Sequence, residues 1–72
     1  MTRDTRAHMG HLAGMVYRSL EEEGKLVSVM DLSIKNNMWP WDVFMALGWL
    51  SREDKVILHK KLIALMAEIR KD

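Results

Sequence analysis

Apolar residues at helical spacing predict a first helix from about His8 to Glu23. Gly24 follows at the position where glycine commonly ends a helix. The short segment from Leu26 to Ser28 then reads as a β-prone connector. The stripe expected to face a core consists of Met9, Leu12, Ala13, Val16 and Leu20, with Tyr17 beside it.

A second, shorter helix is predicted to begin at Ser28, because Ser28 and Asp31 have the spacing of a capping box. The run Lys35-Asn36-Asn37 should end it, since asparagine tolerates the left-handed conformation and competes for backbone hydrogen bonds. The residues expected to face inward are Val29 and Leu32, together with Met30 or Ile34.

The third predicted helix, residues 39–53, is apolar on two sides. Pro40 and Asp42 suit its first turn, where a missing N–H is tolerated and a negative charge is favourable. One face carries an ordinary core stripe of Val43, Ala46, Leu47 and Leu50. The opposite face carries Trp41, Met45 and Trp49 beside Gly48 and Arg52. Such a helix must be covered on more than one side, so the second apolar face is the main clue to function.

The last part of the chain allows two interpretations. Residues 56–59 read as a strand, but Lys60-Lys61 provides no residue suited to a tight turn. The apolar residues that follow, at helical spacing and among strong helix formers, are Leu62, Leu65, Met66 and Ile69. This pattern favours a short strand followed by a C-terminal helix over a β-hairpin.

Length and composition limit the class of protein. The 72 residues suffice for one small domain, which we expect at residues 8–72 after a flexible N-terminus at residues 1–7. Without cysteine, disulfides and thiolate ligands are excluded, and the net charge of +1 gives no strong attraction to polyanions. No apolar run approaches the ~20 residues that span a bilayer, and no signal-peptide pattern begins the chain, so we expect a cytoplasmic protein without membrane contact.

Several segments together resemble a known family. They are Ala13-Gly14 with Val16-Tyr17 and Leu20, Ser28-Val29 with Leu32, and Ala46-Leu47-Gly48-Trp49-Leu50-Ser51-Arg52-Glu53-Asp54-Lys55. The chain is similar to small prokaryotic winged helix-turn-helix proteins of uncharacterised function, whose hallmark is an ALGWL-x-RE-x-K segment ending the third helix. The resemblance implies a helix–strand–helix–helix–wing order, in a mainly α fold with a small β component. The residue pattern after Lys55 departs from a family wing and favours a truncated wing followed by a C-terminal helix. The resemblance also implies DNA binding, by analogy of fold.

Three features bear on this resemblance. Glycine inside a helix costs about 1 kcal/mol relative to alanine, so close packing is the expected reason for Gly48. Trp49 belongs to the hallmark and is expected to be buried under the wing. The segment Trp39-Pro40-Trp41 is unusually aromatic for the family, and its tryptophans either form a small core with the C-terminal segment or lie at an interface.

Candidate chemistry is sparse. His8 and His11 are one turn apart with Asp4 a turn earlier, but such residues near a chain end are more often solvated than metal ligands. His59 has no carboxylate partner that the sequence identifies and reads as an edge histidine in water. The serines lack a nucleophile elbow, and no phosphate-binding glycine loop is present. We therefore expect no enzyme activity, no cofactor and no metal site.

Two classes of function remain. The first is binding of double-stranded DNA, as in transcriptional regulation, with the third helix in the major groove. Base reading favours Arg, Lys, Asn or Gln on the outward face, where this helix offers one arginine. The candidate DNA contacts are Lys35, Asn36, Asn37, Arg52, Lys55, Lys60 and Lys61.

The second class is a protein-interaction module, most simply a homodimer, that uses the aromatic face of the third helix without binding DNA. Aromatic residues and methionine are enriched in interface cores, whereas lysine is depleted. A symmetric dimer is the commonest way of covering an open apolar patch. The candidate interface residues are Trp39, Trp41, Met45, Leu62, Leu65, Met66 and Ile69.

Overall fold

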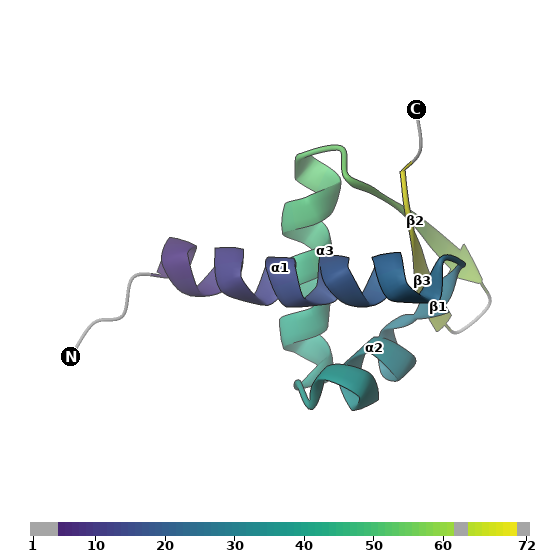
Figure 1. Ribbon diagram of the computed structural model, residues 1–72, viewed down its shortest axis with the longest axis horizontal. Coiled ribbons are helices and arrows are strands. Elements are labelled where there is room, and N and C mark those ends of the chain that lie inside the picture. Colours follow the sequence, from purple (N-terminus) through teal and green to yellow (C-terminus); the bar gives the residue numbers. More distant parts are fainter. Residues whose placement is uncertain (1–4, 62–63, 71–72) are drawn as a thin grey trace.

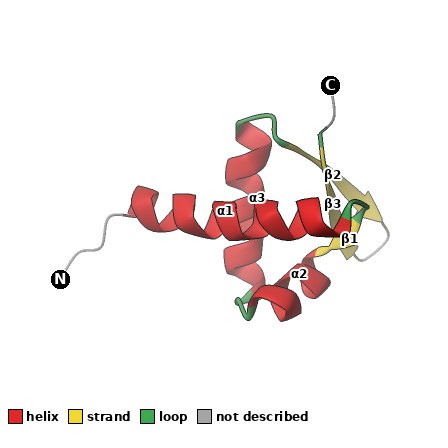
Figure 2. Ribbon diagram, viewed as in Figure 1, coloured by secondary structure: helices red, strands yellow, loops and turns green. Residues whose placement is uncertain are grey.

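The computed structural model describes residues 5–61 and 64–70, as three helices with a small sheet at one end of them (Figures 1 and 2). The elements in order are α1 (Thr5–Glu23), β1 (Val27–Ser28), α2 (Val29–Asn36), α3 (Pro40–Arg52), β2 (Val56–Lys61) and β3 (Ala64–Ile69). α1 crosses α3 and packs mainly against it, and the strands lie near the C-terminal end of α1. No helix in the described ranges is long and apolar enough to cross a membrane.

Both ends of α2 follow from local side-chain chemistry, as predicted. The Ser28 hydroxyl accepts a hydrogen bond from the Asp31 backbone N–H at 3.1 Å, which caps the N-terminus. Asn37 ends the helix with φ of 52°, in the left-handed region that asparagine tolerates.

The prediction that Met30 or Ile34 faces inward is wrong. Val29 and Leu32 are buried, whereas Met30 is 57% exposed and Ile34 is 74% exposed. Each lies two positions from Leu32, about 200° around the helix, so both point away from the side that packs on the core.

The predicted C-terminal helix is wrong, because residues 64–69 form a strand instead. β3 is the central strand of an antiparallel sheet of order β1-β3-β2, and its register with β2 runs from Val56 opposite Ile69 to Lys61 opposite Ala64. The backbone of β3 therefore finds partners on both sides, which outweighs the helix propensity of its residues. The wing is consequently a full hairpin, not a truncated one, and the two residues between its strands lie outside the described residues.

A single core joins the helices to the inner face of the sheet. All three helices and the strands contribute to it, and the most deeply buried large side chains are Leu20, Leu32, Leu47, Val16 and Val43. Ala67, at the centre of β3, lies between Val27 and Leu58 and is fully buried. This core fixes which side of α3 points outward.

Candidate functional site

The turn between α2 and α3 sets the position of α3. The Ser33 hydroxyl donates a hydrogen bond to the Met38 carbonyl, and the Met38 N–H donates to the Ser33 carbonyl at 2.9 Å. α3 then begins at Pro40, as the sequence indicated. The predicted core stripe is confirmed, since the buried residues of α3 are Val43, Ala46, Leu47 and Leu50.

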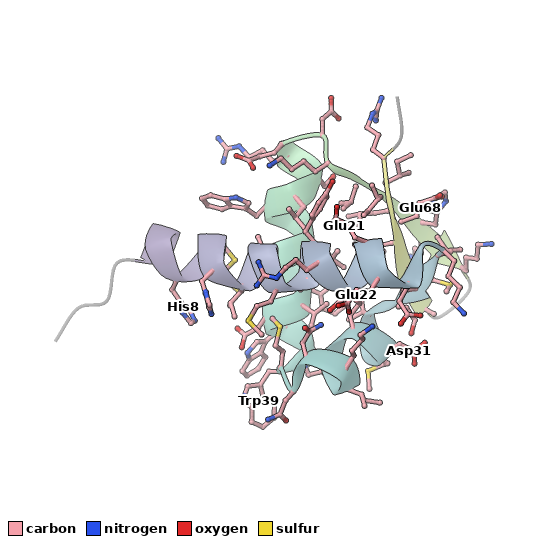
Figure 3. The ribbon with its side chains drawn as sticks, viewed as in Figure 1. His8, Glu21, Glu22, Asp31, Trp39 and Glu68 are labelled. Atoms are coloured by element: carbon pink, nitrogen blue, oxygen red, sulfur yellow. The ribbon has the colours of Figure 1, made fainter. Side chains whose placement is uncertain are left out.

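The outward side of α3 and the preceding turn expose a group of large apolar side chains. Trp39 is 70% exposed, Trp41 67%, Met45 50% and Phe44 49%, and we call these four residues the aromatic patch. The rings of Trp39 and Trp41 contact each other, with centroids 6.1 Å apart. Trp39 projects beyond the turn that joins α2 to α3, at the lower end of the molecule in Figure 3. The alternative of a small core with the C-terminal segment is wrong, because that segment is in the sheet.

Gly48 is on the exposed side of α3, and the expectation of close packing there is wrong. A Cβ atom added to it would meet nothing within 4 Å apart from its own helix backbone and chain neighbours. Trp49, its neighbour, is half-buried and packs against the core. No contact inside the described chain therefore explains a glycine at this position.

The polar residues of the helix-turn-helix turn serve the fold. The Lys35 ammonium lies 2.8 Å from a Glu23 carboxylate oxygen and 3.2 Å from one of Glu22. The hydrogen bond and charge of Lys35 lower the pKa of Glu23, and the hydrogen bonds that Lys35 donates to Glu23 and then to Glu22 raise the pKa of Lys35. The Asn36 side chain accepts from the Ser19 hydroxyl and donates to the Leu32 carbonyl, both at 3.0 Å.

The remaining candidate DNA contacts lie at the tip of the wing and near its base, where α3 leads into β2. Lys60 and Lys61 end β2 at the tip of the hairpin, and both are exposed. At the other end, Arg52 is exposed in the last turn of α3, and the Lys55 ammonium lies 3.9 Å from a Glu53 oxygen. The tip of the wing is thus the place where two adjacent lysines are presented to solvent.

The interpretation of His59 as an edge histidine in water is right about the edge strand but misses a carboxylate partner. Its Nε2 atom lies 2.7 Å from a Glu68 oxygen, between neighbouring strands on the outer face of the wing. Figure 3 labels Glu68 on β3. Sequence reasoning could not find this pair, because it depends on the register of β2 against β3, in which Glu68 is opposite Ile57 and diagonal to His59.

The other predicted interface residues do not join the aromatic patch. Leu65 and Ile69 are half-buried and pack against the core from β3, whereas Met66 lies opposite His59 on the outer face. Leu62 lies outside the described residues.

The described residues contain no group of three side chains suited to hold a metal ion. Of the three residues considered as metal ligands, His8 and His11 are exposed on α1, and Asp4 lies outside the described part of the chain.

Four exposed apolar residues were not among the interface candidates: Phe44, Ile34, Met30 and Ile57. Phe44 follows Trp41 by three positions, a spacing that places neighbours on one helix surface, and this signal was present in the sequence. The outward orientation of Ile34 and Met30 could not be assigned from the sequence, because α2 has apolar residues on both sides.

A helix-turn-helix followed by an antiparallel hairpin defines the class of winged helix-turn-helix domains. The family model for the winged helix-turn-helix domain DUF2582 matches residues 1–66, and the chain belongs to this family. This match confirms the family resemblance seen in the sequence. No curated protein and no solved structure gives a significant match.

Proposed function

We propose that this winged helix-turn-helix domain binds double-stranded DNA, and that it holds the duplex mainly through backbone phosphates at the tip of the wing. The observation that carries the proposal is the pair of exposed lysines, Lys60 and Lys61, at the end of the hairpin. Lysine neutralises phosphate charge regardless of base sequence, and such contacts supply most non-specific affinity for DNA.

The outward side of α3 argues against base reading as the main source of affinity. Base edges are recognised by Arg, Lys, Asn and Gln, whereas this surface presents Trp41, Phe44 and Met45, with Arg52 in the last turn. Lys35 is already paired with two carboxylates, so a phosphate would have to compete with them. We therefore assign phosphate binding to the wing lysines in preference to the turn.

A duplex titration at several salt concentrations tests this assignment. We compare the wild type with Lys60→Ala/Lys61→Ala and, as matched control, Lys35→Ala, using the anisotropy of a labelled mixed-sequence duplex. Removing one lysine that neutralises a phosphate should flatten the plot of log K against log salt by about 0.9. The wing variant should show nearly twice this change in slope, and Lys35→Ala should leave the slope nearly unchanged.

Two results would contradict the proposal. One is absence of duplex binding by the wild type even at low salt, which removes DNA as a ligand. The other is an unchanged slope in the wing variant, or an equal change in Lys35→Ala, which would place the phosphate-binding residues outside the wing. Circular dichroism of each variant checks that the fold is intact.

A further inference from the structure

We infer that the aromatic patch is the contact surface of a symmetric homodimer. Its occupant is the aromatic patch of a second copy of this chain, packed around a two-fold axis beside α3. The inference rests on the area of the patch, its lack of charge and the open position of Gly48.

The exposed apolar area is sufficient for the centre of a dimer interface. At ordinary side-chain sizes, the four patch residues expose about 500 Å², more than isolated apolar residues on a monomer surface normally contribute. Ile34 and Met30 are also exposed, on α2. A standard protein interface buries about 800 Å² on each partner, so two copies can supply it with these side chains at its centre.

The chemistry of the patch fits a second copy better than a nucleic acid. None of the four residues is charged, and the ionisable residue between them, Asp42, is an acid that would repel phosphate. A symmetric dimer places apolar surface on apolar surface and requires no complementary charge. Because the net charge is only +1, repulsion between two copies is small.

The open position of Gly48 is a third, independent observation. Gly48 follows Met45 by three positions and Phe44 by four, so it lies on the same helix surface as the patch. Glycine weakens a helix, and the space above this one is open within the described chain. Glycine in an element interior often marks a place where another backbone approaches closely, and the two-fold contact provides that neighbour.

The dimer surface and the DNA surface are separate. Lys60 and Lys61 are at the tip of the hairpin and are not members of the patch. Loss of self-association therefore leaves the phosphate-binding lysines of the wing in place, and loss of DNA binding leaves the patch in place.

Sedimentation equilibrium of the full chain, from low to high micromolar concentration, tests the inference. The variants are Trp41→Glu and Gly48→Leu, with Ile57→Glu as matched control, since Ile57 is an exposed apolar residue on β2. We expect a wild-type dimer and a dissociation constant raised at least about tenfold in the first two variants. The control should leave the constant within about twofold of the wild type.

Gly48→Leu keeps the test decisive if Trp41→Glu fails to fold. A Cβ atom at this position meets nothing within 4 Å apart from its own helix backbone and chain neighbours, so we expect the monomer to keep its helical circular dichroism while the larger side chain blocks the close approach of a second helix. The inference is overturned if the wild type remains monomeric at high micromolar concentration, or if both variants associate as tightly as Ile57→Glu. A monomeric wild type whose duplex binding is abolished by Trp41→Glu would assign the patch to DNA instead.

Discussion

Gly48 is a residue at which a single substitution should stabilise the monomeric domain. In an exposed helix interior, replacing glycine with alanine stabilises by about 1 kcal/mol, and here the new methyl group enters open space. We expect Gly48→Ala to raise the free energy of unfolding by about this amount in urea denaturation at low protein concentration.

Gly24→Ala is the matched control, and it should destabilise. Gly24 has φ of 64°, a conformation that side-chain-bearing residues adopt only with strain. A loss of stability in Gly48→Ala would mean that some part of the chain packs on this position after all.

At the scale of the elements, the ion pairs of Lys35 connect α2 to the end of α1. Glu21, Glu22 and Glu23 lie in the last turn of α1, where the negative end of the helix dipole disfavours carboxylates, and α1 has no basic residue in that turn. Lys35 supplies the missing positive charge from another helix. A side chain assigned from sequence to DNA is therefore also a contact between two helices.

This contact predicts a pH dependence with a defined sign. Because Lys35 lowers the pKa of Glu23 from 4.5, the carboxylate contributes stability above its ordinary pKa. That stability is lost as the pH falls through the lowered value. Lys35→Met should therefore flatten the dependence of the urea midpoint on pH between neutrality and about pH 3, and Lys61→Met should not. Parallel curves for wild type and Lys35→Met would show that the pair adds nothing to stability.

For the whole molecule, the small core makes stability sensitive to single large side chains. A domain of this length has a free energy of unfolding of roughly 4–11 kcal/mol. Leu47 is fully buried between α3 and the other elements, and removing a buried leucine side chain costs about 2–5 kcal/mol. Leu47→Ala should therefore lower the free energy of unfolding, measured by urea denaturation, by a large fraction of its total. Leu50→Ala, at the next turn, should do the same.

Ile34→Ala is the control for these core variants, because it removes a similar volume from an exposed position. It should change the unfolding free energy by no more than about 0.5 kcal/mol at low protein concentration. Losses below about 1 kcal/mol for both leucine variants would contradict the assignment of the inner face of α3.

The sequence by itself determined the three helices and the inward faces of α1 and α3. The apolar repeat of α3, the Ser28 cap and the left-handed Asn37 all act within a few residues, so each could be recognised without knowing the fold. The ALGWL segment likewise identified the family. These features depend on local sequence, where backbone geometry and side-chain spacing are directly linked.

Only the tertiary structure decided the fate of residues 64–69, the pairing of His59 and the surroundings of Gly48. β3 is a strand because β1 and β2 both offer it hydrogen bonds, and β1 comes from the first half of the chain. His59 meets Glu68 only through the register of that sheet. With β3 committed to the sheet, no part of the described chain covers Trp39 and Trp41, and their exposure results from where the strand packs, which helical periodicity alone could not specify.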